Sequence, residues 1–250
     1  MFKFLNNNQV SFGLDISDKT LKIIQLRKSG EKIKIQAISR YRLKDKVVVD
    51  GEIRDMDVFV DSLKECIKKP IYGSVTTNDV VVSIPEKKSF IKQISIDKGP
   101  NPISDLIAPE IEKYFPFSIK DVFFDWEIVS EDSDSYNVLV SAAPKYAIES
   151  YISALKKANL NVLAIEPESV SLSRSAIRKL SKKSKNTTPP TFAIVDIGAV
   201  ETFIVICSNN SIVMTMGVDV SGQIITEEIA RTLQINESQA EKAKIICGLD

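Results

Sequence analysis

Two aspartates carry the strongest chemical signal in the chain, because each ends an apolar strand and precedes a tight turn. Asp15 lies in SFGLDISDKTLKIIQL and Asp196 lies in TFAIVDIGAVETFIVIC, and in both strings a second apolar run follows the turn. The backbone N–H groups of such a turn can bind an anion. An aspartate beside it can hold Mg²⁺ through the water shell that this ion keeps. The two strings predict two β-hairpins that clasp phosphate groups from two sides.

The second hairpin fits this chemistry better than the first. Gly198 and Ala199 would let a phosphate approach the backbone, and Thr202 adds a hydroxyl group. In the first hairpin Ser17 stands where a glycine would be expected, and Asp18 follows it. An aspartate that ends one strand is commonly only a turn former. Phosphate binding is favoured because the pattern occurs twice, and each time the strand that ends in aspartate opens a three-strand meander.

Two further groups of charged residues have both a functional and a structural interpretation. Glu166 precedes Pro167 between a predicted strand and a predicted helix, where it could present a carboxylate to a water molecule or favour the helix dipole. Glu241 and Lys244 are three residues apart on the last predicted helix. They could hold ribose hydroxyls or form an ion pair in solvent.

The composition excludes several classes of function. The chain has 33 basic and 33 acidic residues, so no overall positive field favours a nucleic-acid partner. It has no histidine, which removes His-based catalysis and His metal sites. The three cysteines form no C-x-x-C pair and indicate reduced thiols. No apolar run is long enough for a membrane span, and MFKFLNNN is not a signal peptide.

The hydrophobic pattern places the hairpins in a mixed α/β chain. After the first meander, helices are predicted at 58–69, 103–118 (with Pro109 as the awkward residue), 145–160 and 169–183, and strands at 79–85, 90–96, 122–129, 136–143 and 161–166. KKSKNTTPPT at 182–191 reads as a linker, and the strand-turn-strand pattern restarts at Phe192. A third strand and helices at 223–235 and 237–248 follow. Compared with the first half, this second half is expected to be incomplete.

Longer strings resemble a known family. The hairpins are similar to the two phosphate motifs of the superfamily of actin, heat-shock chaperones and sugar kinases. MFKFL, EKYFPFSIKDVFFDWEIV, FAIVDIGAVETFIVI and SGQIITEEIARTLQINESQAEKAK resemble, in order, the PilM family of actin-like proteins in type IV pilus assembly. The resemblance covers essentially the whole chain. The second string is the specific one, because the hairpins alone would not separate PilM from its relatives.

The resemblance implies an α/β fold of the actin-like (RNase H-like) ATPase type, with an inserted α/β subdomain and an incomplete second half. By position, 9–78 and 161–188 would form the first actin-like subdomain, and 79–160 the insertion. The second actin-like subdomain would begin at 189–220, and 221–250 would begin its own insertion.

The family also implies ATP and Mg²⁺ as ligands. Asp15, Ser17 and Asp18 would face the phosphates from one side, and Asp196, Gly198, Ala199 and Thr202 from the other, with Asp15 and Asp196 at the metal. Glu241 and Lys244 occupy the A-E-x-x-K position that meets the ribose, and Glu166 lies near the place where relatives position an attacking water. The glycine-rich adenosine loop is absent from the sequence. We therefore expect at most slow ATP hydrolysis, and none from this chain alone.

The implied partner is the short cytoplasmic tail of PilN, a bitopic inner-membrane protein, held in a groove between the first subdomain and the insertion. The protein would then be cytoplasmic and peripheral at the inner face of the membrane, and self-association stays open. The alternatives are an FtsA-like filament protein of cell division and a cytoplasmic component of type II secretion. A sugar or acetate kinase is disfavoured, because no catalytic residue stands out in a substrate loop.

Overall fold

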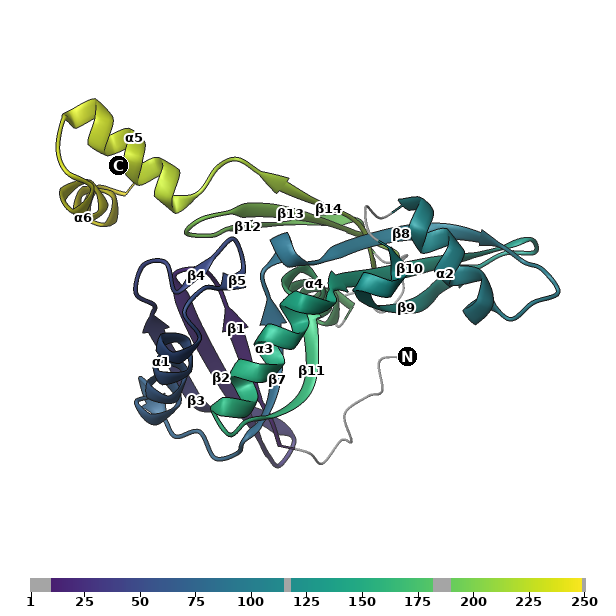
Figure 1. Cartoon of the computed structure of the whole chain (residues 1–250), viewed down its shortest axis with the longest axis horizontal. Coiled ribbons are helices and arrows are strands. Elements are labelled where there is room, and N and C mark those ends of the chain that lie inside the picture. The colour runs from purple at the N-terminus through teal and green to yellow at the C-terminus, as the bar shows by residue number, and fades with distance from the viewer. Residues whose placement is uncertain (1–9, 115–117, 182–189, 249–250) are drawn as a thin grey trace.

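The computed structural model describes residues 10–114, 118–181 and 190–248 (Figure 1). The MFKFL string, the Phe-Pro-Phe segment 115–117 and most of the predicted linker lie outside these ranges. No helix within them is long and apolar enough to cross a membrane.

The first sheet has six strands in the order β11-β7-β1-β2-β3-β6. Its strands are β1 (Phe12–Ile16), β2 (Thr20–Ser29), β3 (Lys32–Arg42), β6 (Tyr72–Gly73), β7 (Asp79–Ile84) and β11 (Asn161–Pro167). The first three form the predicted antiparallel meander, while β7 pairs in parallel with both β1 and β11. Parallel strands end at one edge of a sheet, so this arrangement places Asp15 and the end of β11 together.

Alternation along the strands separates a core face from a second face. Phe12, Leu14 and Ile16 are buried beneath α1 (Met56–Lys68) and α3 (Lys145–Lys157), whereas Gly13 and Asp15 point to the opposite face. Helix α4 (Glu168–Ser181) contacts β7 and β11 from that opposite face. A short hairpin that the sequence analysis did not predict, β4 (Val48–Val49) with β5 (Glu52–Ile53), lies beside the end of the meander (Figure 1).

An inserted antiparallel sheet carries its own core. Its strands are β8 (Phe90–Asp97), β9 (Val122–Glu131) and β10 (Ser135–Pro144), in the order β8-β10-β9. Helix α2 (Ile103–Tyr114) buries Ile107 and Ile111 against this sheet and accommodates Pro109 within its length. Single turns of 3₁₀ helix, Glu86–Lys88 and Ile119–Asp121, precede β8 and β9.

The expected insertion, 79–160, is longer than this inserted sheet. Strand β7 belongs to the first sheet, and α3 contributes Tyr151 and Leu155 to the core of that sheet. The parallel pairing of β7 with β1 joins residues far apart in the chain, so local patterns could not reveal it. We propose that the inserted unit is confined to residues 90–144.

The second half repeats the meander as predicted. Strands β12 (Phe192–Ile197), β13 (Thr202–Ser208) and β14 (Ser211–Val218) pair in sequence order, and helices α5 (Gly222–Leu233) and α6 (Glu237–Cys247) follow. Asn236 begins α6 with a capping box that it forms with Gln239. Phe203, Val205 and Cys207 pack against α4 and against Ile91 and Leu139 of the inserted sheet.

Candidate functional site

The two predicted aspartates converge on the start of helix α4. Lys22 faces Asp15 across the β1–β2 hairpin, and its Nζ forms an ion pair with Asp15 Oδ2 at 2.8 Å. The charges of Asp15, Glu168 and Asp196 all raise the pKa of Lys22 against the opposing effect of its burial. Asp196, which belongs to the second half of the chain, therefore acts on the same side chain as Asp15.

Glu168, the first residue of α4, lies within this cluster of charges. Its burial, followed by the charges of Asp15 and Asp196, raises the pKa of its carboxyl group to about 8. Lys22 acts in the opposite direction. A carboxyl group with this pKa holds its proton at neutral pH, between two hairpins that belong to different halves of the molecule.

Glu166, the predicted catalytic residue, has a different environment from the one expected. It lies on the same face of the sheet as Asp15, with Ser83 between them in register, beside a cavity of about 610 Å³. Arg174, however, donates to both of its oxygens, Nη1 to Oε2 at 2.7 Å and Nη2 to Oε1 at 2.5 Å. Because this guanidinium engages both oxygens, the carboxylate is poorly placed to activate a water. The carboxyl group that does approach both aspartates is that of Glu168.

In the first hairpin, Ser17 and Asp18 satisfy groups of the protein itself. The Ser17 hydroxyl accepts a hydrogen bond from Thr20 N at 3.1 Å and lies 3.0 Å from the Thr20 hydroxyl. The carboxylate of Asp18 accepts from the N–H groups of Asp50 and Gly51 at 2.8 and 2.9 Å. Asp18 therefore orders the β4–β5 turn, and its expected role at a phosphate stays a prediction.

The second hairpin has the tight turn that the glycine predicted. Gly198 N donates to Glu201 O at 2.9 Å, and a Cβ at Gly198 would lie only 2.5 Å from that same oxygen. The turn also contacts α5, since Gly222 N donates to Gly198 O at 3.0 Å and Gln223 N to Ala199 O at 2.8 Å. No other side chain fits at Gly198 without a shift of the backbone.

Thr202 is not open to the turn surface in this structure. Its side chain is buried, and within the described ranges its hydroxyl oxygen has no hydrogen-bond partner. A hydroxyl buried without a partner is unfavourable.

Glu241 and Lys244 form a network with the start of α5. Lys244 Nζ donates to Gly222 O and to Thr226 Oγ1, both at 2.8 Å, and forms an ion pair with Glu241 Oε2 at 2.7 Å. Thr226 Oγ1 also lies 2.6 Å from Glu241 Oε2. The hydrogen bond from Lys244, followed by that from Thr226, lowers the pKa of Glu241. Because Gly222 contacts the turn at Gly198, this network is adjacent to the second hairpin.

The acidic side chains suit a cation that keeps its waters. Within the described ranges, no three acidic, cysteine or histidine residues are close enough to ligate a metal together. The charges of Asp15 and Asp196 nevertheless both act on Lys22 and Glu168, and Mg²⁺ is usually held by one or two carboxylates with the remaining ligands being water. The donor set therefore fits Mg²⁺ held through its water shell.

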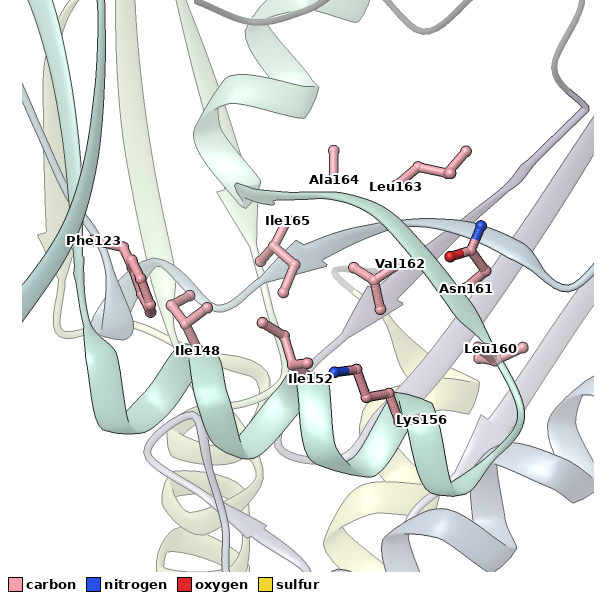
Figure 2. A pocket seen from close by; sticks show the side chains of 10 residues that line it. All are labelled: Phe123, Ile148, Ile152, Lys156, Leu160, Asn161, Val162, Leu163, Ala164 and Ile165. Atoms are coloured by element: carbon pink, nitrogen blue, oxygen red, sulfur yellow. The ribbon is translucent and has the colours of Figure 1, made fainter.

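A separate groove of about 400 Å³ lies between α3 and β11 (Figure 2). Its lining is mainly apolar, with Lys156 and Asn161 as its polar residues, and Phe123, the second residue of β9, completes it. The groove thus lies where the first sheet meets the inserted unit, in the region that the sequence analysis assigned to a partner peptide. It is lined by Phe123, Ile148, Ile152, Lys156, Leu160, Asn161, Val162, Leu163, Ala164 and Ile165.

Sequence reasoning missed three side chains of the candidate site: Lys22, Glu168 and Thr226. Lys22 could have been found from the hairpin, because a short turn pairs it with Asp15. Glu168 follows Pro167 at a predicted helix start, but the sequence does not show that the nearby Glu166 is hydrogen-bonded to Arg174. Thr226 depends on how α5 packs against α6, which leaves no local sequence pattern.

Comparisons with known proteins agree on the fold. A family model described as type IV pilus assembly protein PilM matches residues 13–250. A solved PilM-PilN type IV pilus biogenesis complex is similar with a TM-score of 0.80 and 21% identity, covering 94% of this chain and 69% of that one. The fold is therefore the mixed α/β fold of the actin-like ATPases.

More distant structures share this fold. EutJ of Carboxydothermus hydrogenoformans, an ethanolamine utilization protein, has a TM-score of 0.53 and 12% identity, and MreB5 of Spiroplasma citri bound to AMPPNP has 0.51 and 15%. Each match covers 96% of this chain and 62% of the other. The chain thus spans less than two thirds of these two proteins.

Proposed function

Because the chain belongs to the type IV pilus assembly protein PilM family, we propose that it is an assembly scaffold with two ligands. One is Mg²⁺-ATP, and the other is the cytoplasmic tail of a PilN-like bitopic membrane protein. The tail would hold the protein at the inner face of the membrane. The family match over residues 13–250 favours this role over an FtsA-like filament protein or a type II secretion component.

The apolar groove between α3 and β11 is the observation that carries the tail-binding role. It lies at the boundary between the first sheet and the inserted unit, and Phe123 from the inserted unit is 45% exposed at one end of it (Figure 2). An exposed aromatic side chain beside an apolar groove is typical of a peptide-binding surface. A single groove of this size suits a short peptide and a modest interface.

Asp15, Asp196 and the turn at Gly198 support the nucleotide role. The turn would contact the phosphates, and the two carboxylates would hold Mg²⁺ through its waters, which would offset the phosphate charge. We propose that Glu168, rather than Glu166, lies beside the phosphates, because both carboxylate oxygens of Glu166 accept hydrogen bonds from Arg174. A carboxyl group that keeps its proton at neutral pH is a poor general base, which agrees with slow hydrolysis at most.

Titration calorimetry with a synthetic peptide of the PilN-like tail from the same genome tests the scaffold role. We expect binding with a dissociation constant of roughly micromolar order. Ile152→Asp should abolish it, because a carboxylate would be desolvated on the groove floor. Ser153→Asp places the same residue at the next, exposed position of α3 and should leave binding unchanged. If no peptide from the tail binds, or if both variants bind alike, the proposal is wrong.

The nucleotide role has its own measurement. Mg²⁺-ATP should raise the unfolding temperature of the protein, and Asp196→Asn should remove most of this increase. Asp61→Asn makes the same change on the exposed surface of α1 and serves as the control. An equal increase in both variants would contradict a role for the second hairpin.

A further inference from the structure

The groove runs along a free sheet edge. Strand β11 is the first strand of its sheet, and in the described part of the chain its only strand partner is β7. The cavity is lined by Asn161, Val162, Leu163, Ala164 and Ile165, which are consecutive residues of β11. A bulge at Leu163 shifts the pairing with β7 by one residue, and the cavity touches residues on both sides of this bulge, so it follows the edge of the strand. In Figure 2, Val162 and Ile165 point toward α3, and Leu163 and Ala164 point away from it.

One stripe of α3 forms the floor beside this edge. Ile148, Ile152 and Lys156 recur every four residues and therefore share a helix face. The two isoleucines are half-buried, and the Lys156 ammonium group is directed into the groove (Figure 2). No ion pair that includes Lys156 is found among the described residues. An ammonium group at the end of an apolar floor favours a ligand with an oxygen acceptor at that point.

We propose that the partner segment binds the groove as an added β-strand, pairing its backbone with the free edge of β11. An edge strand presents unpaired N–H and C=O groups to such a partner, and pockets for alternate side chains then provide specificity. The five lining residues of β11 extend over roughly 16 Å, which matches an equal length of extended peptide. This inference rests on the proposed function, since it describes how the tail would be held.

The added-strand geometry defines the chemistry of the segment. Apolar side chains recur at every second residue, where they contact Ile148, Ile152 and Phe123. One residue at the end near Lys156 supplies a side-chain amide or carboxylate oxygen. The intervening side chains point away from α3 and tolerate substitution.

A peptide N-methylation scan by calorimetry tests this geometry with the protein unchanged. Each variant of the synthetic tail peptide carries one N-methyl group, which removes one backbone donor. We expect a loss of roughly five- to tenfold in affinity at every second position and little change at the positions between them. A loss that follows no two-residue period, or no loss at all, would overturn the added-strand inference while tail binding itself would stand. If the unmodified peptide does not bind, the proposed function is the part that fails.

A double-mutant cycle tests the acceptor at Lys156. Lys156→Met keeps the length of the side chain and removes the charge. We expect it to weaken the unmodified peptide, and to have no effect on a peptide whose acceptor residue is replaced by alanine. Lys157→Met makes the same change on an exposed neighbouring position and is the control. Equal losses for both peptides would contradict the contact at Lys156.

Discussion

Glu168 begins α4 with a carboxyl group whose pKa is raised from 4.5 to about 8 by burial and by the charges of Asp15 and Asp196. In the unfolded chain this burial and the charges of Asp15 and Asp196 are lost, so the pKa returns toward its ordinary value. The folded state then binds the proton more tightly than the unfolded state. The contribution of Glu168 to stability is therefore greatest below about pH 4.5 and is lost as the pH rises through about 8.

Glu168→Gln should remove this pH dependence. Without an ionisable group, the variant should unfold at a clearly higher temperature than the parent above pH 8, and at nearly the same temperature near pH 4.5. Thermal unfolding followed by circular dichroism across this pH range measures the difference. Glu149→Gln, at an exposed position of α3, should follow the parent throughout. A constant offset at every pH would mean that the Glu168 carboxyl does not ionise in this range.

The pair of Glu166 and Arg174 predicts an asymmetric effect of substitution. The Glu166 side chain is 7% exposed and the Arg174 side chain 58% exposed. Arg174→Met leaves a buried carboxylate without its partner, so the free energy of unfolding should fall by about 1–3 kcal/mol. The double substitution with Glu166→Gln should recover part of this loss. Urea unfolding measures the free energy of unfolding of the single and double variants. A loss in the double variant that equals or exceeds the sum of the two single losses would contradict the pairing.

At the scale of elements, the sequence predicted the parts whose signals are local. Apolar alternation placed the strands around Asp15 and Asp196, and helical spacing placed α1, α3, α5 and α6. Pro109 did not end α2, because Ile107 and Ile111 are buried on either side of it and hold the helix to the inserted sheet. What the sequence could not supply was long-range pairing. The membership of β7 in the first sheet, and the engagement of Asp18 by the β4–β5 turn, both depend on contacts between distant residues.

The β12–β13 turn predicts an effect of one methyl group. Gly198→Ala would place a Cβ 2.5 Å from the carbonyl oxygen of Glu201, which is a backbone atom of the same tight turn and cannot rotate away as a flexible side chain could. We expect a loss of about 1–3 kcal/mol in the free energy of unfolding, together with weaker nucleotide binding. Gly99→Ala is the matched control, because no heavy atom lies within 4 Å of the added carbon. Equal stability of the two variants would mean that the turn relaxes freely.

At the scale of the whole molecule, the second half is joined to the rest through a shared core. Phe203, Val205 and Cys207 on β13 pack against Val170 and Leu172 of α4 and against the inserted sheet. A buried carboxyl group, that of Glu86, adds a polar contact, since Ser169 N at the start of α4 donates to its Oε2 at 3.3 Å. Burial raises the pKa of Glu86 as well. The first sheet and the second half therefore share α4, while the inserted sheet packs on the second half through β8 and β14, and we expect the three units to unfold together.

Val205→Ala tests this coupling, because the protein has one tryptophan and it lies far from the substitution in the sequence. Val205 belongs to the second half and is fully buried, whereas Trp126 lies on β9 of the inserted unit. The lost methyl groups should cost about 1–3 kcal/mol, and the fluorescence transition of Trp126 should shift by the same amount as the circular dichroism transition. Val213→Ala removes the same atoms from a 44% exposed side chain on β14 and should have little effect on either. If the Trp126 transition stays at the parent midpoint while circular dichroism shifts, the inserted unit unfolds independently. The packing of Ile91 and Leu139 against β13 would then not couple the inserted unit to the second half.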